Sequence, residues 1–204
     1  MRRKRRGLGG SRRGRGAAMT EAAIISPVFF ALLFGVIEMG ILFRDHLTIT
    51  NATRDGARTA AAAGSDVDAD WRILQTIKQS AAAADEGDIQ RIVIFQASST
   101  SDKPTAACKA GSAVDGVCNV YTVADFNRPA SDFDCSDVLV DRRFCPSGPI
   151  SPTGPPYWRD TRMSALGYIG VYVEMRHRYV TGFFGASVMI RDTTVVRIEP
   201  RTAI

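Results

Sequence analysis

The stretch that decides the fold is residues 16–43, GAAMTEAAIISPVFFALLFGVIEMGILF. From position 22 to position 43 it runs for 22 residues in which Glu38 is the one charged side chain. About 20 apolar residues are enough to cross the hydrocarbon core of a membrane as an α-helix. A core helix of a soluble protein would carry a polar face, and this segment has almost none. The stretch therefore predicts a transmembrane helix, which we place at residues 17–43.

A basic leader, residues 1–16, precedes this helix. It contains eight Lys and Arg residues and no acidic residue, whereas the rest of the chain has 18 Lys and Arg against 21 Asp and Glu. The net charge of +5 therefore belongs to the leader. Because basic residues beside a span stay in the cytoplasm, we predict a single-pass protein of the cell membrane. Its N-terminus is expected in the cytoplasm and its C-terminal domain outside it.

A basic tail can also bind nucleic acid. This leader lacks the aromatic side chains on which single-stranded nucleic acids stack, and it lies directly before a span. We therefore predict the membrane as a partner and no nucleic acid.

The junction between leader and span contains a Gly, four residues and a Glu, from Gly16 to Glu21. A basic leader, this Gly-x4-Glu spacing and a long apolar helix together resemble the N-terminus of type IV prepilins. In that family a membrane aspartyl peptidase cuts after the Gly. The resemblance implies that a prepilin peptidase cleaves this chain between Gly16 and Ala17, which makes Glu21 the fifth residue of the mature protein.

Glu21 would then lie one helical turn from the new α-amine of Ala17. A charged group deep in a span costs ~2.5–3.5 kcal/mol, and pairing with the amine of a neighbouring subunit would offset such a cost. The prepilin resemblance therefore implies that Glu21 is a subunit-assembly residue. The alternative is that Glu21 stabilises the start of the helix through the helix dipole, with Gly16 as part of a glycine-rich tail.

Residues 16–64 are similar, more narrowly, to the N-terminal region of TadE-like proteins. That family shares a GxxxxE start, a Pro early in the span, an F-G-x-x-E-x-G segment and an N-A-x-R-x-G-A-R-x-A-A-x-G run. Here these are Pro27, residues 34–40 and residues 51–64. The resemblance implies a minor pseudopilin of a tight-adherence (Tad, or Flp-type) pilus and secretion system. Its implied partners are other pilin-like subunits and Tad assembly proteins.

Glu38 is the second carboxyl group inside the predicted span. An ionisable residue in a span is a functional hypothesis by default, and we predict that Glu38 also takes part in subunit assembly. Because it lies five residues from the outer end of the apolar run, it can instead reach toward the membrane surface. Both interpretations stay open.

Beyond the span the sequence predicts an α+β arrangement. We expect a helical stalk at 44–64 and an extracytoplasmic domain at 65–204, with a second amphipathic helix and a small antiparallel sheet. In the turn between the last two strands, Phe183 and Phe184 either form an exposed contact patch or fold back on the core, and we favour the latter. The expected second helix is 68–84, the expected strands are 89–95, 168–180 and 187–198, and the turn is 181–185.

A long irregular insertion is expected at 98–163, because this part is rich in Ser, Thr, Asp, Gly and Pro. It holds all four cysteines, and disulfides persist outside the cytoplasm. The ten-residue spacing favours the pairs Cys108–Cys118 and Cys135–Cys145, although four cysteines allow three connectivities. Zinc is the competing interpretation, but there is no C-x2-C motif or nearby His, and we predict no metal.

The sequence contains no phosphate-binding loop, no HExxH and no nucleophile elbow. We therefore predict that the protein is not an enzyme and has no cofactor. The favoured function is an assembly component of a Tad pilus, retained in the membrane or extracted into the pilus. The alternative is an uncleaved single-pass membrane protein that displays an extracytoplasmic binding domain.

Overall fold

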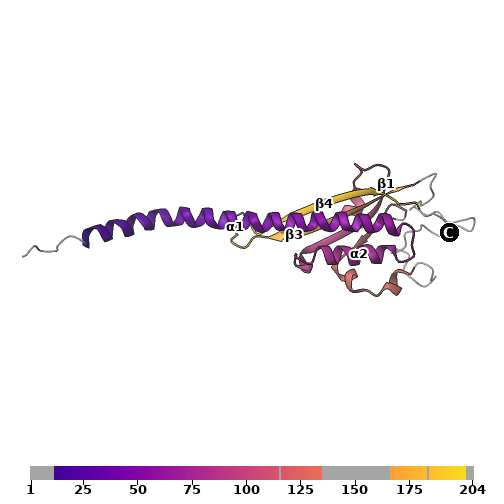
Figure 1. Cartoon of the computed structure of the whole chain (residues 1–204), viewed down its shortest axis with the longest axis horizontal. Helices are drawn as coiled ribbons and strands as arrows, with labels where there is room; N and C mark the ends of the chain where they lie inside the picture. The colour runs from indigo at the N-terminus through magenta and orange to yellow at the C-terminus, as the bar shows by residue number, and fades with distance from the viewer. Residues whose placement is uncertain (1–11, 115, 135–165, 183, 201–204) are drawn as a thin grey trace, which may run out of the picture.

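The structure, a computed structural model, describes residues 12–114, 116–134, 166–182 and 184–200. These residues form one long helix, a second helix and a four-stranded antiparallel sheet, which confirms the predicted α+β class. The long helix, α1 (Arg12–Ala63), extends far beyond the domain at its N-terminal end (Figure 1). The other elements gather around its C-terminal half.

α1 is an unbroken helix of 52 residues, so the predicted continuation of the apolar helix into a helical stalk is confirmed. It ends before Gly64, whose φ of 54° lies in the left-handed region that favours glycine after a helix. Only 6% of its most apolar 18-residue stretch is buried, and by length and composition the helix is able to cross a membrane. This part of α1 is therefore not a core helix of the domain.

The sheet has the strand order β2-β1-β3-β4, with every neighbouring pair antiparallel. β3 and β4 form a hairpin that is paired from Tyr168 and Arg197 at its open end to Arg178 and Ser187 near its turn. Three of the strands confirm the predicted ones, while β2 lies in the stretch predicted to be irregular. The strands are β1 (Ile89–Ala97), β2 (Cys118–Tyr121), β3 (Tyr168–Arg178) and β4 (Ser187–Arg197).

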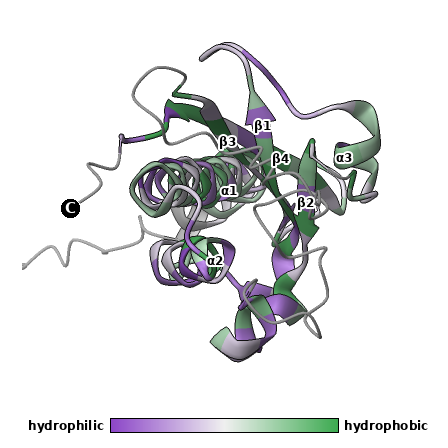
Figure 2. Ribbon diagram, turned by 90° about the vertical axis from the view of Figure 1, so that its right-hand side faces the viewer, coloured by the Kyte–Doolittle hydropathy of each residue, from purple (hydrophilic) through white to green (hydrophobic). Residues whose placement is uncertain are grey.

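Two helices, α1 and α2 (Ala69–Ser80), cover one face of the sheet (Figure 2). α2 confirms the predicted second helix, although it ends four residues earlier. Between the helices and the sheet lies a core of fully buried side chains, among them Ile49, Ile77 and Val171. α2 can approach α1 closely because a Cβ at Gly56 would lie only 2.8 Å from Cγ1 of Ile77.

The opposite face of the sheet is covered by α3 (Ala106–Ala110) and the segment around it (Figure 2). The predicted Cys108–Cys118 disulfide is present, and it ties α3 to β2 beside the buried ring of Phe95. The other predicted pair, Cys135–Cys145, lies outside the described residues.

The insertion is thus only partly irregular. Between 98 and 134 it contains α3, β2 and two short 3-10 helices, Val123–Asn127 and Ala130–Phe133. β2 was missed because four residues carry too little alternation to reveal a strand. The remainder of the predicted insertion falls outside the described ranges.

Replacing both Cys108 and Cys118 with Ala should lower the free energy of unfolding of the domain by ~2.5–3 kcal/mol, because the bond closes a loop of about ten residues. Urea unfolding of the full chain in detergent, followed by near-ultraviolet circular dichroism, measures this change. Cys135 and Cys145 are replaced with Ala in both proteins so that no other thiol can pair. Equal stability of the two proteins would show that the disulfide does not stabilise the domain.

Candidate functional site

The predicted cleavage junction lies on the exposed N-terminal part of α1. Gly16 and Ala17 are helical and exposed, and the hydroxyl of Thr20 donates to the carbonyl of Gly16 at 2.7 Å. Glu21 is exposed and forms no hydrogen bond or ion pair with any residue in the described part of the chain. Its carboxyl group is therefore accessible to another molecule, and both cleavage and the assembly role stay predictions.

Glu38 lies in a different environment, because its side chain is only 1% exposed. The tip of the β3–β4 hairpin folds against α1 at this point (Figure 1). The backbone N–H of Thr181 donates to Oε2 of Glu38 at 3.2 Å, and the Thr181 hydroxyl donates to the same oxygen at 3.1 Å. Glu38 therefore has a partner within its own chain, which neither of the two sequence interpretations included. Its role in assembly stays a prediction.

Phe184 of the hairpin tip also lies against α1. Its ring lies 3.9 Å from the position that a Cβ of Gly35 would occupy, and it packs against Tyr179 with ring centroids 6.0 Å apart. The side chain is nevertheless 49% exposed. The expectation that Phe184 folds back on the domain core was therefore wrong, because the hairpin extends past the core onto α1. Phe183 lies outside the described residues.

Further polar contacts join the hairpin and the residues that follow β4 to α1. From Glu38 to Ala61 the helix rises ~35 Å, and the contacts are distributed along this length. Because each joins residues far apart in the sequence, they fix how the hairpin lies along the helix. They pair Asp45 with His177 (2.8 Å), Thr53 with Asp192, and the carbonyl of Ala61 with the N–H of Glu199 (3.1 Å).

Asp45 is the most connected of these residues. It is buried beside Nδ1 of His177, and it also accepts hydrogen bonds from the guanidinium of Arg44, one of them at 2.9 Å. The imidazole of His177 is 2% exposed, and it contacts the ring of Tyr179 edge-on. Removing one partner of a buried hydrogen-bonded pair leaves the other polar group unsatisfied, which is destabilising, so this pair holds β3 to the helix just outside the apolar run.

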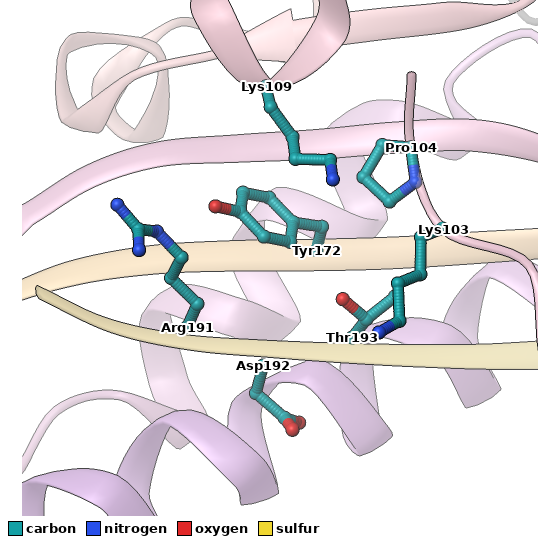
Figure 3. A pocket seen from close by; sticks show the side chains of 7 residues that line it. All are labelled: Lys103, Pro104, Lys109, Tyr172, Arg191, Asp192 and Thr193. Carbon is teal, nitrogen blue, oxygen red and sulfur yellow. The ribbon is translucent and has the colours of Figure 1, made fainter. Parts of the chain in front are cut away.

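A basic pocket of about 390 Å³ lies on the face of the sheet turned away from α1 (Figure 3). The strands β3 and β4 form its floor, and α3 with the segment before it forms the rim. The side chain of Asp192 points away from the other side chains, toward the helices (Figure 3). The lining residues are Lys103, Pro104, Lys109, Tyr172, Arg191, Asp192 and Thr193.

Three hydrogen-bonded side chains border this pocket. The Tyr172 hydroxyl and Nε of Arg191 each donate to Oε2 of Glu174 at 2.7 Å. Burial and the neighbouring Glu174 raise the pKa of Tyr172 to about 12. Burial alone would raise the pKa of Glu174, but hydrogen bonds from Arg191 and Tyr172 outweigh it and lower this pKa. Near neutral pH the phenol therefore stays protonated, and Glu174 balances the charge of Arg191.

The two lysines give the pocket its positive charge. Neither Lys103 nor Lys109 forms an ion pair with a residue that the structure describes. Clefts lined by one sign of charge attract ligands of the opposite sign, so binding of an anionic group is the chemistry that this arrangement supports. Within the described ranges no three His, Cys, Asp or Glu side chains form a cluster that could hold a metal ion. The absence of a metal from the whole chain stays a prediction.

Asp70, which the sequence analysis did not single out, is a buried carboxyl on the first turn of α2. It accepts hydrogen bonds from the side-chain amide of Asn119 at 2.6 Å and from the hydroxyl of Tyr121. Both partners lie on β2, so Asp70 joins the second helix to the edge of the sheet. No local pattern could reveal this role, because the partners are 49 and 51 residues away.

Replacing Thr181 with Val should speed amide hydrogen exchange in the hairpin tip about tenfold, which corresponds to ~1.4 kcal/mol of local opening free energy. The variant keeps the shape of the side chain but loses the hydroxyl that donates to Glu38. Thr181→Ser keeps the hydroxyl and should exchange like the parent. Hydrogen exchange of the full chain in detergent, read by mass spectrometry, makes the comparison. Identical exchange in all three proteins would mean that the hydroxyl does not hold the tip on α1.

Comparison with known proteins connects one part of this structure to a family. The family model described as TadE-like protein matches residues 16–58. No curated protein and no solved structure matches the chain. The matched residues contain the junction, the apolar run and much of the part of α1 that packs on the sheet, while the sheet itself and the basic pocket lie outside the match. Residues 16–58 of the long helix are therefore similar to TadE-like proteins, as the sequence predicts.

Proposed function

We propose that this chain is a minor pseudopilin, an assembly component of a Tad (Flp-type) pilus and secretion apparatus that is held in the cell membrane by α1. The observation that carries the proposal is the match of residues 16–58 to the TadE-like family, which is a family of pilus components. The matched segment begins at the Gly of the Gly-x4-Glu junction, and its apolar part is exposed along the free end of α1.

The length of the free part of α1 supports a single membrane crossing. From Ala17 to Gly35, where Phe184 first contacts the helix, α1 rises ~27 Å. The hydrocarbon core of a bilayer is about 30 Å thick. With the basic leader in the cytoplasm, the sheet and the second helix lie outside the cell membrane.

Glu21 is the residue through which we propose that subunits assemble. Its carboxyl group lies at the start of the apolar run and has no partner among the described residues of this chain. Cleavage after Gly16 would leave a free amine on Ala17 of each subunit. The carboxyl of one subunit and the amine of its neighbour are complementary, and their pairing fixes how far one helix lies along the next.

The proposed partners are a prepilin peptidase, other pilin-like subunits and Tad assembly proteins. The TadE-like family is not known for enzymatic activity. We accordingly propose no catalytic role and no cofactor for this chain.

A second candidate function is supported by the basic pocket. An uncleaved single-pass protein that displays a binding domain would need a ligand site outside the membrane, and the pocket between Lys103 and Lys109 has the size and charge for an anionic group. The two functions differ at the junction, since the first requires cleavage after Gly16 and the second does not.

We expect the mature protein to begin at Ala17, because the basic leader and Gly-x4-Glu junction match the requirements of a prepilin peptidase. Mass spectrometry of the membrane-fraction protein from cells with an active prepilin peptidase identifies the first residue. Gly16→Val should leave the leader attached, whereas Gly14→Val is a matched control that changes a leader glycine outside the junction. An intact leader on the unchanged protein in such cells would exclude the pseudopilin proposal and favour the displayed binding domain.

Glu21→Ala should abolish pilus assembly while the protein still inserts and is still cut, because the carboxyl that pairs with a neighbouring amine is gone. If Glu21 only stabilises the helix start, the same change costs ~1 kcal/mol or less and assembly continues. Pilus formation at constant protein level, measured by electron microscopy, distinguishes the two roles.

Two further variants isolate the charge. Glu21→Gln keeps the size and hydrogen bonding of the side chain but loses its charge, and should fail like Ala. Met19→Ala changes a nearby residue that is 75% exposed and should assemble normally. Assembly by the Gln variant would mean that an ion pair with Ala17 does not position the subunit.

A further inference from the structure

The tip of the β3–β4 hairpin carries no charged residue. Between Arg178 and Arg191 lie twelve residues, YVTGFFGASVMI, without a single Asp, Glu, Lys or Arg. We define the hairpin tip as residues 179–186, of which Phe183 lies outside the described residues. Val180 is 74% exposed and Phe184 49% exposed, so the tip presents apolar side chains outward although it packs on no domain core.

The helix beside the tip is apolar and exposed as well. Met39 and Phe43 are 37% and 65% exposed. A further groove of about 430 Å³ between α1 and β4 is lined largely by apolar side chains, including Leu42, Phe43 and Val188. Contiguous exposed apolar surface of this kind marks an interaction site or a membrane contact.

This surface is continuous with the predicted span. Exposed apolar residues surround α1 from the start of the apolar run up to the tip, among them Val28, Phe30 and Leu33. The one carboxyl in that part of the helix, Glu38, is covered by the tip and bonded to Thr181. The tip therefore removes from the surface the only charged side chain of the apolar run.

Charged residues begin at the same level on both elements. On α1 the first charged residue after the apolar run is Arg44, which is bonded to Asp45. Asp45 in turn contacts His177, and the next residue on that strand is Arg178. Charged side chains thus start together just above the tip, as expected where a molecule leaves the hydrocarbon and enters the headgroup region.

Part of the backbone of the tip is hydrogen-bonded within the protein. In lipid each backbone polar group needs a partner within the protein. The N–H of Tyr179 donates to the carbonyl of Ala186, and the N–H of Gly185 donates to the carbonyl of Gly182, both at 3.2 Å. The N–H of Thr181 donates to Glu38. Three of the N–H groups of the turn are therefore satisfied without water.

We propose that the hairpin tip inserts beside α1 into the outer leaflet of the membrane, with lipid acyl chains as its partner. This inference rests on the membrane anchoring proposed above and adds a second, independent membrane contact. The tip lies near the boundary of hydrocarbon and headgroups, the depth at which amphipathic segments bind. Because the hairpin is fixed along α1 by several polar contacts, the inserted tip sets the orientation of the whole domain on the membrane.

The test places tryptophan reporters in the full chain, reconstituted in phosphatidylcholine liposomes with and without bromine on the upper part of the acyl chains. Phe184→Trp and Val180→Trp report on the tip. Val28→Trp is the positive control within the span, and Val67→Trp is the negative control at the far end of the domain, where Val67 is 46% exposed. The native tryptophans contribute a background that is measured on the parent protein and subtracted.

Both tip reporters should be quenched by brominated lipid about twofold more than Val67→Trp, and aqueous iodide should quench them less, because lipid covers the tip. The reverse pattern at the tip, with Val28→Trp still quenched by brominated lipid, would overturn the inference and leave the membrane anchoring intact. Failure of Val28→Trp as well would overturn both. Shielding from iodide without quenching by brominated lipid, found only at high protein-to-lipid ratio, would assign the tip to a second copy of the chain and overturn the lipid contact.

Discussion

The constraint on which this structure depends is that one helix must fit two different environments, an exposed apolar one and a domain core. Along its free half α1 exposes large apolar side chains, and along its other half it packs into a domain core. The change is achieved by side-chain size, since the buried face of the second half consists largely of small residues such as Ala52, Gly56 and Ala60. Larger side chains there would hold α2 and the sheet away, as the contact between Gly56 and Ile77 shows. The family match contains Ala52 and Gly56 but ends at Arg58, before Ala60, so part of this close packing belongs to the TadE-like segment.

Polar contacts then decide where the hairpin lies along this helix. Apolar contacts alone would allow the hairpin to slide along the helix, but buried polar groups must keep their hydrogen-bond partners. Glu38, Asp45 and Thr53 all face the hairpin, and each is bonded to it. Moving the hairpin by one helical turn would leave all three without these bonds, at a cost of ~1–3 kcal/mol for each buried group. The sheet is thereby fixed relative to the span. The hairpin tip consequently stays at one level along α1.

Local patterns were enough to predict the helix ending at Gly64, the three longer strands and the Cys108–Cys118 bond, because periodicity, turn residues and cysteine spacing are properties of short segments. What could not be predicted depends on partners distant in sequence. Thr181 is hydrogen-bonded to Glu38, which lies 143 residues away in the sequence, and Asp70 is hydrogen-bonded to Tyr121, 51 residues away. Asp192 interrupts the apolar alternation of its strand, and the structure shows that it accepts a hydrogen bond from Thr53 on α1.

The two carboxyl groups of the apolar helix, Glu21 and Glu38, differ in whether the fold supplies a hydrogen-bond partner. Both belong to the TadE-like segment, and their sequence surroundings gave each of them the same proposed role. The structure supplies Glu38 with two donors from Thr181, so the cost of placing it in the apolar run is offset within the chain. Glu21 has no such donor among the described residues. If cleavage frees the amine of Ala17, a lone subunit keeps a cost at Glu21 that reaches ~2.5–3.5 kcal/mol only at full depth, and a neighbouring amine relieves it. Glu21, which has no partner among the described residues, is therefore the residue that we propose for subunit assembly.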